Sequence, residues 1–269
     1  MKFFRSIFEF YINASIHVAL AVASLVAVTA IEFDLSLTNS FYYFIIFGSI
    51  TGYNFVKYAE IAGLHHRSLV KRLKGIQVFS LFCFFGMLIF ALRLSLNTLL
   101  VTLGFAVITL LYAVPLLFKK NLRSIAGLKI TMVALVWTGV TVLLPFVSIE
   151  DSLSGVFYFT FIQRFIVVIV LILPFDIRDL QYDKTTLKTI PQSFGIKKTK
   201  RLGIFLLTIV LIMEGFKAPP SAVKISVLVF VCFLVATSLV CAQKKQSKYF
   251  TSFWVESIPI VWYLLLFAF

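Results

Sequence analysis

The acidic side chains of this sequence are concentrated in one short stretch. Asp176, Asp179 and Asp183 are three of only eleven acidic residues in a chain of 269. Spacings of three and four place their carboxylates on one face of a helix. Because neighbouring carboxylates repel one another, this cluster requires a cation beside it, either a metal ion or a basic side chain.

The surroundings of the cluster indicate where it lies. An apolar run, residues 165–175, comes directly before Asp176, and a strongly basic segment follows Asp183. An apolar run that ends in charged residues is typical of a helix leaving a membrane. We therefore expect the aspartates at the membrane edge, at the end of a transmembrane helix.

Composition supports this placement. The chain is 61% hydrophobic and only 13% charged, whereas a soluble domain is about half apolar and about a quarter charged. These values are typical of a polytopic membrane protein and argue against a soluble enzyme or a nucleic-acid-binding domain. The three cysteines lie in or beside apolar runs without a CxxC pattern, so we expect neither disulfides nor a metal site from them.

The apolar runs predict an all-α membrane bundle forming a single domain over residues 1–269. Nine segments are long enough to cross a bilayer as helices, and the continuous runs exclude a barrel. The predicted spans are 8–31, 41–61, 76–95, 98–118, 128–149, 154–178, 201–217, 222–242 and 250–268.

Basic residues predict the orientation. The N-terminus and alternate connectors, starting with the one between the second and third spans, carry 21 of the 25 lysines and arginines. Such residues favour the cytoplasmic side. We therefore expect the N-terminus and the aspartate cluster on the cytoplasmic side and the C-terminus outside, as in an integral protein of a bacterial inner membrane.

Two motifs carry a resemblance to a known family. The first is IRDxxxD followed by KTxP and a glycine, and the second is YxxP, KK, R and GLK. Together with the nine-span pattern they resemble the UbiA superfamily of membrane prenyltransferases, most closely its menaquinone-type branch. The matching residues are Ile177, Arg178, Asp179, Asp183, Lys188, Thr189, Pro191 and Gly195, then Tyr112, Pro115, Lys119, Lys120, Arg123, Gly127, Leu128 and Lys129.

The resemblance implies a Mg²⁺-dependent transfer of an isoprenoid group from a prenyl diphosphate to a membrane-soluble acceptor, aromatic or otherwise. Carboxylates and phosphate oxygens are the ligands that Mg²⁺ prefers, and basic side chains bind the remaining diphosphate oxygens. The implied metal ligands are Asp176, Asp179, Asp183 and Asn54, with Asp179 and Asp183 as the main catalytic pair. The implied substrate contacts are Arg178, Lys184, Lys119, Lys120, Arg123, Tyr112 and Tyr58.

The sequence departs from the family near the end of the second span. The family's first acidic motif, NxxxDxxxD, corresponds to Asn54, but Tyr58 and Ala62 occupy the two aspartate positions. Glu60 is the nearest acid, about 120° around the helix from Asn54. Three interpretations remain open: an enzyme with one acidic cluster, an enzyme with a shifted ligand, and a non-catalytic homologue that binds a lipid or a membrane partner.

One further pair of charges lies deep in the apolar segments. Arg164 and Glu256 both fall near the middle of their spans, where a charge is costly and usually faces a partner or a cavity. We expect them to pair inside the bundle, either as a structural contact or as part of the acceptor pocket. A small-solute transporter is a further alternative, although the internal repeats typical of transporters are not evident.

Overall fold

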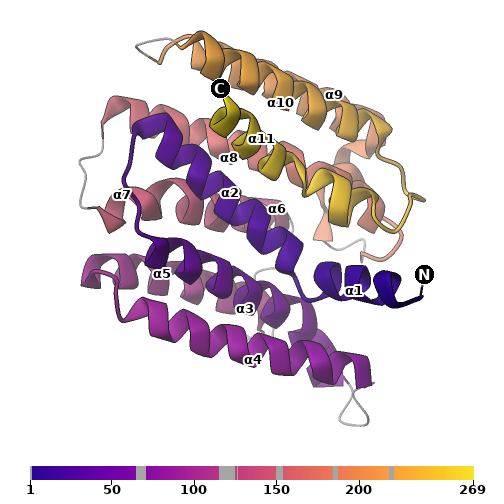
Figure 1. The fold of residues 1–269 in the computed structure, drawn as a ribbon. Helices are drawn as coiled ribbons and strands as arrows, with labels where there is room; N and C mark the ends of the chain where they lie inside the picture. Colours follow the sequence, from indigo (N-terminus) through magenta and orange to yellow (C-terminus); the bar gives the residue numbers. More distant parts are fainter. Residues whose placement is uncertain are drawn as a thin grey trace.

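A computed structural model describes residues 2–64, 71–114, 125, 127–149, 154–183, 187–217 and 221–269, without the side chains of residues 2, 59–64 and 71–73. Within these residues the chain is a bundle of helices (Figure 1). The elements are α1 (Lys2–Asn13), α2 (Ile16–Phe33), α3 (Asn39–Leu64), α4 (Lys71–Ala91), α5 (Leu96–Ala113), α6 (Leu128–Thr138), the π-helix η2 (Gly139–Leu143), α7 (Leu144–Ser148), α8 (Gly155–Asp179), α9 (Ile190–Glu214), α10 (Ala222–Cys241), the π-helix η4 (Phe250–Val255) and α11 (Ile258–Ala268).

The predicted spans can be compared with these helices. In the described part of the chain, seven helical segments are long and apolar enough to cross a membrane: α2, α4, α5, α6 to α7, α8, α10, and η4 to α11. The remaining two predicted spans fall on α3 and α9, which are long helices but are not among those seven. The all-helical membrane architecture is thus confirmed, while the count of nine crossings stays a prediction.

The first predicted span, residues 8–31, is wrong at its start. The chain breaks between α1 and α2 at Ser15, whose φ of 61° lies in the left-handed region. Asn54 of α3 holds the break, because its amide oxygen accepts a hydrogen bond from Ser15 Oγ at 2.8 Å and its nitrogen donates one to Ala14 O at 3.1 Å. The membrane-crossing helix therefore begins at Ile16, and α1 is a separate amphipathic helix.

The arrangement places α2 in the interior and α4 on the outside. About two thirds (67%) of the membrane-span residues of α2 are buried inside the bundle, against 11% of those of α4. Helix α2 packs against α3 and α11, while α8 packs against α6, α9 and α10. Close helix contacts depend on small residues, since a Cβ on Gly203 would lie 2.2 Å from the Leu239 side chain.

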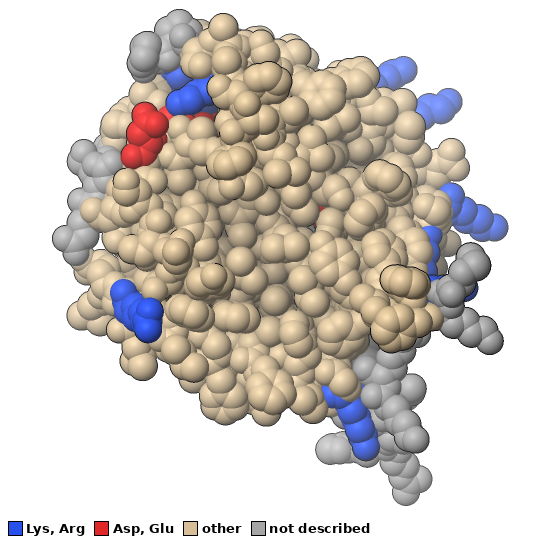
Figure 2. Space-filling view, in the orientation of Figure 1, with Lys and Arg blue, Asp and Glu red and all other residues tan. Residues whose placement is uncertain are grey.

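The two ends of the bundle differ in charge. Helix α1 and the connector from α10 to η4 lie at one end, and the C-terminus lies at the other (Figure 1). Figure 2 shows basic side chains gathered at the α1 end, with fewer at the opposite end. This asymmetry follows the distribution on which the predicted orientation depends.

Candidate functional site

The three aspartates lie together at the end of α8. Asp176 is 1% exposed, Asp179 is the last residue of the helix, and Asp183 follows in a turn. The Asp183 backbone N–H donates to Asp179 O at 2.8 Å, so the turn continues the helix and keeps the third carboxylate near the other two. The predicted single face is therefore confirmed.

Lys129, the second residue of α6, supplies the cation that the cluster requires. Its ammonium nitrogen lies 3.1 Å from Asp176 Oδ1, 3.6 Å from Asp179 Oδ2 and 2.7 Å from Asp183 Oδ2. The side chain is only 12% exposed, which strengthens each attraction relative to the protein surface. Lys129 matches the second motif in the sequence, but its spacing from the aspartates along the chain does not predict that it lies beside them.

Arg178 joins the aspartate cluster to the last span. Its Nε donates to Asp179 Oδ1 at 2.8 Å, and its Nη1 donates to Thr251 Oγ1 at 2.7 Å. Thr251 is buried in η4. Because the end of α8 touches the beginning of η4, α8 runs toward this end of the bundle while η4 and α11 run away from it.

One oxygen of the cluster suits a metal ion. Asp176 Oδ2 is buried and has no hydrogen-bond partner among the described residues, and an unpaired buried carboxylate oxygen is costly. Yet no three His, Cys, Asp or Glu side chains in the described ranges are arranged to enclose a metal ion. The residues therefore fit a hard cation held by one or two carboxylates and completed by other oxygens, which is the usual way that Mg²⁺ binds beside phosphates.

Aromatic and charged side chains from other helices lie in the neighbouring interior. Trp137 Nε1 donates to the Tyr53 hydroxyl, and Tyr53 and Tyr112 are close enough to interact electrostatically. Glu256 interacts electrostatically with Lys57 and Tyr53 as well as with Arg178 of the cluster.

Tyr11 of α1 also lies within range of Glu256. Partial burial, with the Glu256 charge as the smaller cause, raises the pKa of the Tyr11 hydroxyl. Helix α1 therefore approaches the same interior region from the membrane edge.

The predicted pairing of Arg164 with Glu256 is wrong. Arg164 is 1% exposed and donates to Leu25 O at 2.9 Å and to Glu32 Oε2 at 3.5 Å, with its guanidinium over the Trp262 ring at 4.7 Å. Helical side chains lean toward the N-terminus of their helix. Because α8 and η4 run in opposite directions, Arg164 and Glu256 lean toward opposite ends of the bundle.

Asn54 and Tyr58 are hydrogen bonded at the α1–α2 break. Both ends of the Asn54 amide are used at the α1–α2 break, and the Tyr58 hydroxyl donates to Asn13 O at 2.9 Å. Lys57 Nζ donates to the same carbonyl at 3.1 Å. This part of α3 thus fixes the N-terminal helix, and the metal-ligand role of Asn54 and the substrate contact of Tyr58 stay predictions.

Several predicted substrate contacts lie outside the described residues, namely Lys119, Lys120, Arg123 and Lys184. The segments that flank them are joined, because Gly127 N donates to Leu187 O at 3.1 Å.

Gly127 has a φ of 77° and Gly195 a φ of 76°, a region that glycine adopts without strain. Tyr112 is placed at the buried end of α5, 8% exposed.

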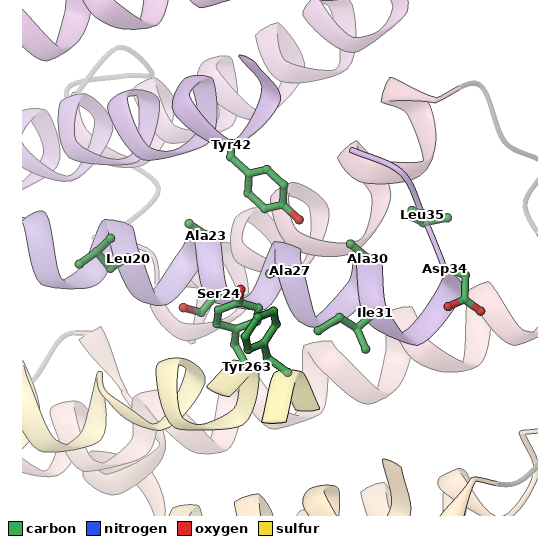
Figure 3. Close-up of a pocket in the computed structure, with 11 residues that line it drawn as sticks. Leu20, Ala23, Ser24, Ala27, Ala30, Ile31, Asp34, Leu35, Tyr42 and Tyr263 are labelled. Carbon is green, nitrogen blue, oxygen red and sulfur yellow. The ribbon is translucent and has the colours of Figure 1, made fainter. Parts of the chain in front are cut away.

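A groove of about 600 Å³ lies between α2, α3 and α11 (Figure 3). Small residues of α2 form part of its wall, and Tyr42 and Tyr263 lie on either side of that helix. Asp34 and Leu35 line the groove at the end of α2 away from the aspartate cluster. Its lining is mostly apolar, as expected for a site that takes a hydrocarbon chain.

Several solved structures are similar to this chain over most of its length. A UbiA homologue from Archaeoglobus fulgidus bound to DMAPP and Mg²⁺ superposes with a TM-score of 0.64 at 14% identity, covering 96% of this chain and 98% of the other. The same homologue bound to GPP and Mg²⁺ gives a TM-score of 0.61 at 14% identity over the same shares. A digeranylgeranylglyceryl phosphate synthase gives 0.57 at 15% identity, covering 96% and 95%.

The chain therefore has the UbiA fold, over essentially its whole length. No protein-family model and no curated protein sequence matches it.

Proposed function

We propose that this protein is a UbiA-type prenyltransferase that uses Mg²⁺ and a prenyl diphosphate. One observation carries the proposal: the aspartates of the IRDxxxD motif converge with Lys129 and Arg178 at one end of a UbiA-fold bundle. The similar structures bound to DMAPP or GPP with Mg²⁺ support the choice of substrate class.

The cluster suits the loss of a diphosphate. Ionisation of the allylic C–O bond leaves negative charge on the departing diphosphate, and a bound Mg²⁺ would neutralise part of it. One or two of Asp179, Asp183 and Asp176 would hold that ion, while Arg178 and Lys129 are the cations placed to meet the remaining oxygens. Lys119, Lys120, Arg123 and Lys184 are proposed as further contacts to the diphosphate.

The interior above the cluster suits the other half of the reaction. The faces of Tyr53, Tyr112 and Trp137 stabilise an allylic cation through their π-electrons, and their apolar bodies exclude water. We propose an acceptor of the aromatic, quinone-precursor type or another lipid, and a site that opens on the cytoplasmic side. The groove along α2 offers space for a membrane-soluble chain.

A non-catalytic lipid-binding homologue is the second candidate. Tyr58 and Ala62 stand where the family has aspartates, and Tyr58 and Asn54 are committed to the α1–α2 break. That candidate predicts binding of a prenyl diphosphate without turnover.

The test is pyrophosphate release from geranyl and geranylgeranyl diphosphate, measured on the full chain in nanodiscs with and without Mg²⁺ and an aromatic acceptor. Asp179→Asn should abolish release, and Glu214→Gln, at the end of α9 away from the cluster, should leave it intact. Binding of labelled substrate is measured in parallel. Binding without release would favour the second candidate, and neither binding nor release would refute the proposal.

A further inference from the structure

The protein already balances two of the three negative charges at the aspartate cluster. The three carboxylates carry a formal charge of minus three, and Lys129 and Arg178 return two positive charges within salt-bridge distance. The cluster as it stands is therefore short of one positive charge before any ion binds.

Helix α3 does not add a second acidic cluster within the described side chains. Its Asn54 and Tyr58 are hydrogen bonded to the α1–α2 break, and the charged group beside them is a lysine, Lys57. Position 62 is an alanine. The carboxylates that would hold a second metal ion opposite α8 are thus replaced at both motif positions.

Lys129 occupies the position from which a second ion would contact the α8 carboxylates. Its ammonium reaches all three aspartates within 3.6 Å and is closest to Asp183. A second divalent cation would have to displace this ammonium or be bound without carboxylates at the two α3 motif positions. Asp176 Oδ2, buried and unpartnered among the described residues, remains as a free ligand atom for one ion.

We infer that the site takes a single divalent cation with the prenyl diphosphate, and that the Lys129 ammonium supplies the positive charge of the absent second ion. This inference rests on the proposed function. A diphosphate brings roughly three negative charges. With the three carboxylates this makes about six negative charges, against four positive charges from one divalent ion, Lys129 and Arg178. The basic residues proposed above as further diphosphate contacts would meet the remainder.

The inference is tested by counting ions. Mn²⁺ replaces Mg²⁺ as a paramagnetic probe, and the full chain in nanodiscs is titrated with Mn²⁺ at saturating geranyl thiolodiphosphate, a slowly reacting analogue. Free Mn²⁺ is followed by electron paramagnetic resonance, and the analogue's affinity is measured separately. We expect one analogue-dependent Mn²⁺ per chain in the wild type and in Lys129→Arg.

Lys129→Met removes the built-in cation and frees the carboxylates. We expect its stoichiometry to rise to two Mn²⁺, and its affinity for the analogue at low Mn²⁺ to fall by about tenfold, the equivalent of one charge-assisted contact. One Mn²⁺ with unchanged affinity in Lys129→Met would overturn the assignment to Lys129.

The number of Mn²⁺ ions bound by the wild type tests the single-ion inference even if Lys129→Met does not fold. Two analogue-dependent Mn²⁺ per chain would overturn the single-ion inference and leave the proposed function standing. Failure of the wild type to bind the analogue at any Mn²⁺ concentration would overturn both.

Discussion

Arg164 provides a quantitative test of how the bundle is held together away from the aspartate cluster. Arg164→Met keeps the length of the side chain and most of its apolar contact, but removes the guanidinium. The charged hydrogen bond to Leu25 O contributes about 1.5–3 kcal/mol, and stacking on Trp262 about 0.5–2 kcal/mol. Glu32, at 3.5 Å and 16% exposed, contributes less. We expect a loss of about 3 kcal/mol in the free energy of unfolding.

The assay is unfolding by SDS titration in mixed micelles, followed by tryptophan fluorescence. Arg93→Met is the matched control, because Arg93 is an exposed arginine in the turn after α4 and its replacement should change stability by less than about 0.5 kcal/mol. In the double variant Arg164→Met with Glu32→Gln, the two losses should fall short of additivity by about 1 kcal/mol. A loss below about 1 kcal/mol in Arg164→Met, or strict additivity, would refute the pairing described above.

Three further predictions concern the site and its supports. Asn54→Ala should destabilise the protein by about 1–3 kcal/mol through loss of its hydrogen bonds at the α1–α2 break, while analogue-dependent Mn²⁺ binding stays unchanged; a changed Mn²⁺ stoichiometry would restore Asn54 as a ligand. Gly203→Ala should cost about 1–3 kcal/mol in SDS titration because its Cβ would lie 2.2 Å from Leu239, and the double change with Leu239→Ala should recover part of it; no loss would mean that the helices separate freely. Removal of divalent ions with EDTA should abolish binding of labelled prenyl diphosphate but leave the far-ultraviolet circular dichroism intact, because Lys129 already neutralises part of the carboxylate charge; loss of helix with EDTA would contradict this.

The sequence was a good guide to the helices because apolar length decides membrane spans. Where the ends of the predicted spans fall in the described residues, they lie within a few residues of the helix ends, except at the start of the seventh, where α9 begins at Ile190 rather than at 201, and at the start of the first. There the apolar run continues through Ser15, and the break depends on hydrogen bonds from Asn54, almost forty residues away. Contacts of that kind leave no periodic signal in a sequence.

The candidate site was only partly predictable for a similar reason. The spacing of Asp176, Asp179 and Asp183 predicts one face, and their repulsion predicts a cation. Which cation it is depends on how α6 packs beside α8, and Lys129 stood among many lysines that the topology alone explains. Lys129 lies one residue into an apolar run, where a charge is costly and usually has a partner. This position is the feature of the sequence that indicates a buried ion pair.

The pairing of α8 has a consequence for how the protein is made. Helix α8 carries Arg164 into the membrane, where a charge near the bilayer centre costs about 2.5–3.5 kcal/mol on insertion, and buries Asp176 near its end. Their partners, Glu32 on α2 and Lys129 on α6, both come earlier in the chain. During synthesis from the N-terminus, the helices that carry Glu32 and Lys129 are therefore made before α8. As α8 enters the membrane, Arg164 and Asp176 can form these ion pairs when they lose their water.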